Sequence, residues 1–144
     1  VGVIAEVLLF MLIPRLFQRF TLRHIMLLSL LLCSLRWMLI AFYPDQSGVL
    51  WFAQLLHAAS FGSLHAVGIA LVYHYFSPAT QGRGQALFAS AGSGAGGAAG
   101  AMLSGVFWAA WGGQGTFLAA ALISMLAIVM ALGWIFPEKV KRLD

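Results

Sequence analysis

Four ionisable side chains stand inside long apolar stretches of this chain: Glu6, Arg36, His57 and His65. An ionisable group inside a bilayer costs about 2.5–3.5 kcal/mol on insertion scales, so such residues are candidates for function. A histidine can take up and release a proton near neutral pH. Glu6 can pair with Arg36, although we expect the two to differ in depth by one helical turn. We therefore predict that these residues bind a substrate or carry a proton; the alternative is hydrogen bonding that only holds helices together.

A stripe of polar and aromatic residues surrounds the histidines. Gln54, His57, Phe61 and His65 recur at helical spacing, and Ser60 lies beside them. Because polar groups on a membrane helix face the bundle interior or a water-filled cavity, we expect this stripe to do so. We add Gln54 and Ser60 to the residues predicted to bind substrate or couple protons.

We predict neither a metal site nor a cofactor. Residues His57 and His65 lie about 12 Å apart along one helix, which is too far for a shared metal ion. Cys33 is the single cysteine of the chain, so cysteine chemistry offers neither a disulfide nor a cluster. With no nucleophile beside a base, we expect no enzyme activity.

The composition requires a membrane. The 144 residues are 62% apolar and 8% charged, with a mean hydropathy of +0.94. A soluble domain carries about 25% charged residues. We therefore predict an all-α membrane protein and interpret its basic charges as marking one membrane face, so that no nucleic-acid partner is expected.

Five apolar stretches are separated by charged or Pro- and Gly-containing connections. Each complete stretch can cross a hydrocarbon core of about 30 Å as a helix. We expect five transmembrane helices, at about residues 1–14, 24–43, 49–76, 82–111 and 115–136, followed by a tail at 137–144.

The basic residues alternate between connections. The first and third connections and the tail hold seven of the eight: Arg15, Arg19, Arg23, Arg83, Lys139, Lys141 and Arg142. If the chain crosses five times, these segments share one side, and the positive-inside rule makes that side cytoplasmic. We therefore expect a multi-pass protein of the cytoplasmic membrane with its C-terminus in the cytoplasm.

The fourth stretch is rich in glycine. Gly92, Gly96, Gly100 and Ser104 recur every four residues and so share one helical face. Such a face lets another helix approach closely, and we predict that it serves helix packing. A nucleotide-binding glycine loop is excluded because it needs a strand before it and a helix after it in a βαβ unit.

Three segments resemble a known family: Gly-Val-Ile-Ala-Glu-Val at 2–7, Leu-Arg-Trp at 35–37, and Gln54 to Gly62 with His65. They are similar to the phenylpropionate-permease-like branch of the major facilitator superfamily, which is related to the lactose and nucleoside proton symporters. The resemblance implies helices 8 to 12 of a twelve-helix fold. Residues 1–144 would then be part of the C-terminal six-helix half, with the N-terminal half of the same transporter as partner.

The resemblance also implies roles for single residues. Glu6 matches the helix 8 carboxylate that contributes to substrate binding in lactose-permease-like symporters, and Arg36 matches the helix 9 arginine associated with proton coupling. His57 matches the helix 10 histidine, which in lactose permease is followed three residues later by a proton-carrying glutamate. Ser60 occupies that position here, so the proton must be carried by another group.

By this resemblance we expect a secondary transporter of a bacterial inner membrane that works by alternating access. Its partners would be the lipid bilayer, protons and a small organic anion such as an aromatic carboxylate (3-phenylpropionate-like). Two alternatives stay open: a symporter of sugars or nucleosides, and a helical membrane scaffold or sensor subunit that transports nothing.

Overall fold

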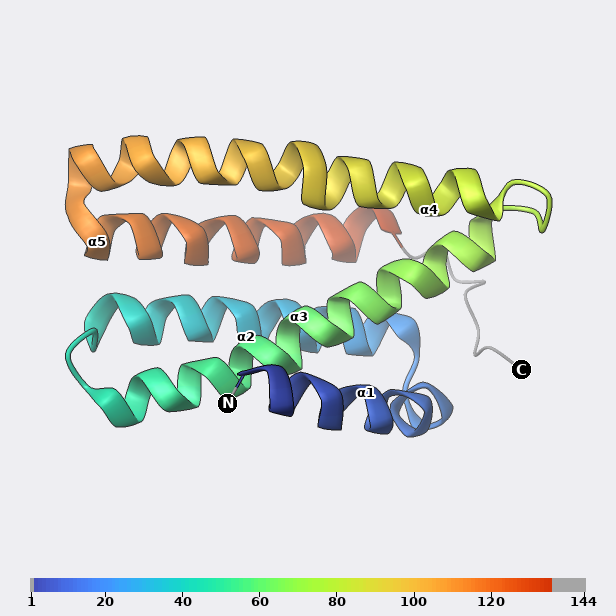
Figure 1. Ribbon diagram of the computed structural model, residues 1–144, viewed down its shortest axis with the longest axis horizontal. Helices are drawn as coiled ribbons and strands as arrows, with labels where there is room; N and C mark the ends of the chain where they lie inside the picture. The colour runs from blue at the N-terminus through green and yellow to red at the C-terminus, as the bar shows by residue number, and fades with distance from the viewer. Residues whose placement is uncertain (1, 136–144) are drawn as a thin grey trace.

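The computed structural model describes residues 2–135, and within them every regular element is a helix (Figure 1). The elements in chain order are α1 (Gly2–Arg19), α2 (Leu22–Phe42), α3 (Ser47–Tyr75), α4 (Gln81–Ala89), η1 (Ser90–Gly96), α5 (Gly97–Met130) and η2 (Ala131–Ile135). The elements η1 and η2 are π-helical, and α4, η1 and α5 follow one another without a connecting loop. The predicted tail at 137–144 lies outside the described residues.

The first helix continues beyond its predicted end near Pro14. The helix α1 includes Pro14 and ends at Arg19. A proline inside a helix removes one backbone hydrogen bond and crowds the preceding turn, but membrane helices tolerate this loss where neighbouring groups compensate. After the bend at Phe20, the Thr21 hydroxyl accepts a hydrogen bond from the backbone N–H of His24 and caps α2.

The chain reverses within α5 at Gly112. This residue has φ 67° and ψ −172°, a conformation that a side chain would strongly disfavour. Figure 1 shows the two halves of α5 running side by side on either side of this reversal. The sequence predicts a connection between residues 111 and 115, and the reversal falls there.

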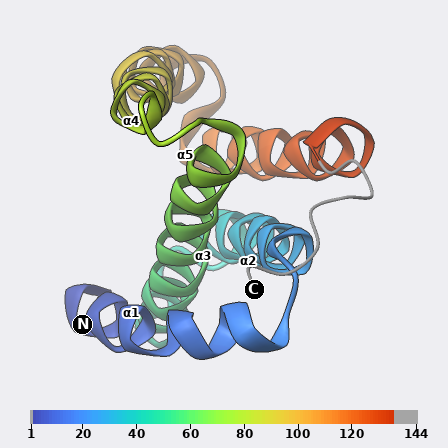
Figure 2. The same ribbon diagram turned by 90° about the vertical axis from the view of Figure 1, so that its right-hand side faces the viewer.

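The helix α3 packs against both α1 and α2. The helix α2 packs against α3 on one side and against α5 on the other, while α1 packs against α3. Figure 2 shows α3 running obliquely from α1 toward α4. The contact between α2 and the second half of α5 includes stacked rings of Trp37 and Phe117, whose centroids lie 5.6 Å apart.

The packing is that of a membrane protein, with small residues inside and large apolar ones outside. Ala53, Ala58 and Ser34 are almost completely buried, whereas the side chain of Met102 is 76% exposed. Small buried residues let membrane helices approach closely. The hydroxyl groups of the buried serines and of Thr116 donate to carbonyls one turn earlier in their own helix, for Ser29, Ser34, Ser60, Thr116 and Ser124.

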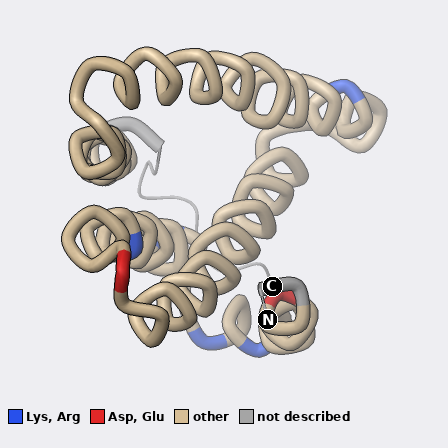
Figure 3. The backbone as a smooth tube through the Cα atoms, turned by 60° about the vertical axis from the view of Figure 1, so that its left-hand side comes forward, with Lys and Arg blue, Asp and Glu red and all other residues tan. Residues whose placement is uncertain are grey.

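Three helical stretches of the described chain are long and apolar enough to cross a membrane: Leu22–Phe42, Ser47–Tyr75 and Gln81–Gly133. Figure 3 shows how few charged positions lie along them. These stretches confirm the prediction of an all-α membrane protein. The third is 53 residues long and contains the reversal at Gly112, and α1 is not among them. Five crossings therefore stay a prediction.

Candidate functional site

Three of the predicted site residues meet, each from a different helix. Arg36 of α2 donates a hydrogen bond from Nη1 to Nδ1 of His57 on α3, over 2.7 Å. The other ring nitrogen of His57, Nε2, lies 3.8 Å from Oε1 of Glu6 on α1. His57 thus stands between Glu6 and Arg36, two residues that the sequence suggested could pair although their expected depths differ by one helical turn. We call these three side chains the charged triad.

A close approach of α1 to α3 positions Glu6. Gly62 faces Leu9, and a Cβ atom on Gly62 would lie only 2.7 Å from Cδ2 of Leu9. Leu9 follows Glu6 by three residues on α1, and Gly62 follows His57 by five on α3. Because residues three or four apart share a helix face, Glu6 lies on the same face of α1 as Leu9, the residue that contacts α3 at Gly62.

Arg36 is held by an aromatic ring as well as by His57. Its guanidinium carbon lies 3.9 Å from the centroid of the Trp37 ring, a cation–π geometry, and Trp37 in turn stacks on Phe117 of α5. The Nε atom of Arg36 is buried and has no hydrogen-bond partner among the described residues. A guanidinium has five N–H donors, and one of them is engaged in the hydrogen bond to His57, so others remain for an added acceptor.

The hydrogen-bond direction defines the protonation state of His57. A guanidinium can only donate, so Nδ1 of His57 must accept and carries no proton. A neutral ring then bears its hydrogen on Nε2, the atom nearest Glu6. At 3.8 Å this contact is too long for a hydrogen bond. A second proton on His57 would break the bond with Arg36 and create an ion pair with Glu6.

The charged triad lies at the edge of the helix contacts rather than in a sealed core. The side chains of His57 and Glu6 are 34% and 27% exposed. Gln54, one turn before His57, is exposed on the same helix, and so is His65. A molecule approaching this face of α3 can therefore reach the charged triad without unfolding a helix.

Within the described chain, the side chains of Ser60 and His65 are not linked to the side chains of the charged triad by a hydrogen bond, although the Ser60 hydroxyl also donates to the backbone carbonyl of His57 over 3.3 Å. The Ser60 side chain is 1% exposed, and its hydroxyl donates to the Leu56 carbonyl of its own helix over 2.8 Å. The ring of His65 lies between those of Phe61 and Phe88, at centroid distances of 6.3 and 5.9 Å. The structure thus brings Glu6, Arg36 and His57 together, and the roles of the other predicted residues stay predictions.

His65 lines a cavity of about 700 Å³ between α3 and the α4–η1 segment. Phe61, Phe88 and Tyr75 also line it, and Gly92 lies on its α4–η1 side. Within its lining, Phe88 packs directly on Gly68. The cavity offers an apolar and aromatic lining with one histidine.

The predicted packing face of glycines is open. Gly92 and Gly100 have no atom within 4 Å of a built Cβ position, and Gly96 meets only the Ala91 carbonyl of its own helix. Ser104 donates to the carbonyl of Ala101 over 2.8 Å. No helix among the described residues covers this face, so its packing partner stays a prediction.

Residues 2–135 contain no group of three or more His, Cys, Asp or Glu side chains that could hold a metal ion. The arrangement of Glu6, His57 and Arg36 instead offers exchange of a proton and recognition of an anion. Proton exchange and anion recognition need only the carboxylate, imidazole and guanidinium groups of these three residues.

The sequence analysis gave no role to three residues that shape this region: Trp37, Gly62 and Phe88. Trp37 follows Arg36 directly, so the sequence could have indicated a contact between the guanidinium and the aromatic ring. Gly62 closes the motif that begins at Gln54, but its contact with Leu9 depends on how two helices cross. Phe88 reaches His65 from a separate helix, and nothing local in the sequence marks that contact.

The comparisons with known proteins agree with the fold. Residues 1–119 match the family model described as the MFS_1 like family. No curated protein and no solved structure matches the chain. The family match indicates a transporter. The family match and the apolar helices both indicate a multi-pass membrane protein. The chain belongs to the MFS_1 like family, and so to the major facilitator superfamily.

Proposed function

We propose that the chain is part of a proton-coupled transporter for a small organic anion, in which the charged triad binds the anion and carries the proton. One observation supports this most directly: the contacts from Glu6 through His57 to Arg36 link three helices. Such a link connects a change of charge to the relative positions of the helices. The family match supports a transporter, and the coupling is our inference from the geometry.

The charge balance of the site explains why an anion and a proton would enter together. Glu6 and Arg36 carry opposite charges and His57 is neutral, so the resting site has no net charge. A carboxylate alone would leave one uncompensated negative charge in a poorly solvated region, which is costly. One proton on His57 restores neutrality, so the charge balance favours one proton for each monovalent anion.

The hydrogen bonds provide a mechanism for this coupling. A carboxylate that binds the guanidinium of Arg36 competes with Nδ1 of His57 for the same donors. Once released, Nδ1 can accept a proton, and the imidazolium then pairs with Glu6 through Nε2. Loss of the proton would return His57 to Arg36 and expel the anion. The proton carrier is thus His57, which removes the need for an acid at Ser60.

The surroundings favour a substrate with an apolar or aromatic body. The ring of Trp37 covers the guanidinium, and Phe61 stacks against His57 at a centroid distance of 5.4 Å. An aromatic carboxylate such as 3-phenylpropionate could place its carboxylate on Arg36 and its ring against these residues. Gln54 and His65, exposed on the same helix, would contact other parts of the substrate.

Alternating access would occur in the cytoplasmic membrane, with the N-terminal half of the same transporter completing the central cavity. The open face of Gly92, Gly96, Gly100 and Ser104 would give a neighbouring helix room to slide during the cycle. The basic connections would face the cytoplasm, which makes the C-terminus cytoplasmic.

The second candidate is a helical scaffold or sensor subunit, in which the charged triad only joins helices. Uptake by the complete natural protein in proteoliposomes separates the two. We expect an imposed inward proton gradient to drive uptake of labelled 3-phenylpropionate, accompanied by alkalinisation outside. The variant Arg36→Lys keeps the charge but loses the planar pair of donors, so uptake should fall at least tenfold.

The matched control is Arg83→Lys, which changes an exposed arginine on α4 and should leave uptake unchanged. Sugars and nucleosides tested in the same vesicles decide the substrate class. Uptake of none of these compounds would favour the scaffold, and uptake unaffected by Arg36→Lys would exclude the charged triad as the binding site.

A further inference from the structure

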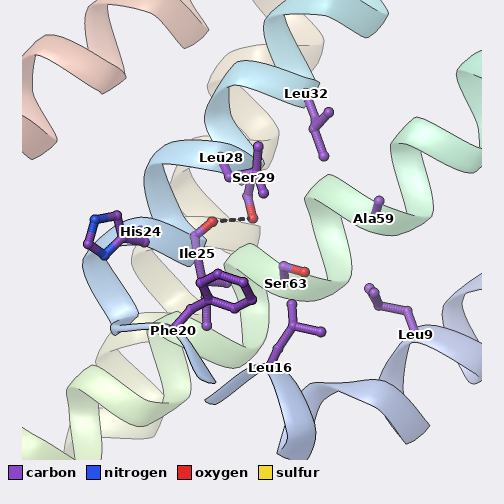
Figure 4. Close-up of a pocket in the computed structure, with 10 residues that line it drawn as sticks. All are labelled: Leu9, Leu16, Phe20, His24, Ile25, Leu28, Ser29, Leu32, Ala59 and Ser63. Carbon is purple, nitrogen blue, oxygen red and sulfur yellow. Dashed lines mark hydrogen bonds between the residues drawn. The ribbon is translucent and has the colours of Figure 1, made fainter. Parts of the chain in front are cut away.

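A second cavity lies between α1, α2 and α3, and none of the three residues of the charged triad lines it. Its volume is about 350 Å³, and ten residues line it, among them Leu9 and Leu16 of α1, Leu32 of α2 and Ala59 of α3 (Figure 4). From His24 to Leu32 it follows α2 over eight residues, or about 12 Å. The cavity therefore extends from the α1–α2 bend into the apolar length of the helices.

The lining is almost entirely hydrocarbon. Leucine, isoleucine, phenylalanine and alanine side chains form most of it, and Phe20 at the bend is 55% exposed. The Ser29 hydroxyl already donates to the Ile25 carbonyl over 2.7 Å, the hydrogen bond drawn in Figure 4. An occupant of this cavity would thus be held mainly by apolar contact, with His24 and Ser63 as the other polar residues of the lining.

Basic residues neighbour the lining residues at the α1–α2 end of the cavity. Arg15, Arg19 and Arg23 each come directly before a lining residue, and all three are exposed. Among residues 2–135, no ion pair engages their guanidinium groups. An apolar slot next to three unpaired cations complements a molecule with a hydrocarbon chain and an anionic head.

We infer that this cavity binds an anionic phospholipid, with an acyl chain along α2 and the phosphate held by Arg15, Arg19 and Arg23. Basic clusters beside grooves between membrane helices attract anionic headgroups. A soluble anion would use the arginines but not the cavity, and a neutral lipid would use the cavity but not the arginines. This inference does not depend on the transport proposal, because lipid retention is measured without transport.

The test is native mass spectrometry of the complete natural protein in detergent, titrated with phosphatidylglycerol or phosphatidylcholine of identical acyl chains. We expect tighter retention of phosphatidylglycerol. The triple variant Arg15→Gln/Arg19→Gln/Arg23→Gln should weaken that binding by about fivefold per arginine removed and leave phosphatidylcholine unchanged. Arg83→Gln, on another helix, is the control and should have no effect.

Filling the cavity should have a different effect. Ala59→Leu places three extra carbons among the lining residues and should weaken retention of both lipids, whereas Ala109→Leu on the exposed surface of α5 should not. Equal retention of the two lipids by the wild type would overturn the inference, as would a triple variant with unchanged preference. Competition by glycerol 1-phosphate as effective as by the whole lipid would also overturn it, because the headgroup alone would then suffice.

Discussion

Replacing His57 with asparagine tests the coupling mechanism most sharply. The asparagine carbonyl can accept the hydrogen bond that Arg36 now donates to Nδ1 over 2.7 Å, but it cannot take up a proton. Retaining this acceptor matters because leaving a half-buried guanidinium unpaired costs about 1–3 kcal/mol. His57→Asn should therefore preserve the folded site and remove the titrating group.

The expected magnitude follows from the charge count. With Glu6 negative, Arg36 positive and His57 neutral, binding of one carboxylate is linked to uptake of one proton. The apparent affinity for the anion should then fall about tenfold for each unit by which the pH rises through the neutral range. In His57→Asn no proton is taken up, so the affinity should be weaker at low pH and independent of pH.

Two assays measure this, equilibrium binding of labelled substrate between about pH 6 and pH 8 and uptake in proteoliposomes. The variant should still exchange substrate across the membrane but should not accumulate it against a gradient. The control is His24→Asn, an exposed histidine at the start of α2, which should behave as wild type. A tenfold change per pH unit that persists in His57→Asn would refute our assignment and point to Glu6 as the proton carrier.

Three glycine substitutions test the packing by thermal unfolding in detergent, with Gly48→Ala, which has no neighbour within 4 Å, as their common control. Gly68→Ala should lower the unfolding free energy by about 1–3 kcal/mol because the methyl group would overlap the Phe88 ring; a second substitution, Phe88→Leu, should restore part of it. Gly112→Ala should lower the unfolding free energy by about 1–3 kcal/mol, because residues with a side chain rarely adopt a φ of 67°. Gly62→Ala should cost less than Gly68→Ala, because it meets one flexible leucine tip; an equal or larger loss would show that the α1–α3 crossing is rigid.

Much of the fold was predictable from the sequence because hydropathy, proline and glycine act locally. The apolar runs predicted α2 and α3 to within a few residues, and the glycines at 112–115 indicated the reversal. The continuation of α1 through Pro14 was not predictable, since it depends on how surrounding groups compensate the lost hydrogen bond. The π-helical turn at Ser90–Gly96 likewise has no local signal that separates it from an α-helix.

The sequence singled out Glu6, Arg36 and His57, whose side chains meet in the structure, but it did not predict how they contact one another. Glu6 could be named as a partner for Arg36, but counting residues along each helix gave depths that differ by one helical turn. Such counting assumes parallel helices, whereas α3 runs obliquely past α1 (Figure 2). The tilt brings His57 between the two charges. Which side chains meet between helices therefore depends on the angle at which the helices cross. That crossing depends in turn on contacts such as the one between Gly62 and Leu9.

The position of the charged triad gives a physical reason for placing proton chemistry here. The helix α1 packs against α3, and a cavity lies between α1 and α2 along part of their length. The polar contacts from Glu6 through His57 to Arg36 connect α1 to α2 by way of α3. Protonation of His57 would strengthen its contact with α1 and break its contact with α2 in a single step. Binding of one proton would thus change whether the His57 side chain of α3 contacts α2 or α1. Alternating access requires a contact with two such states.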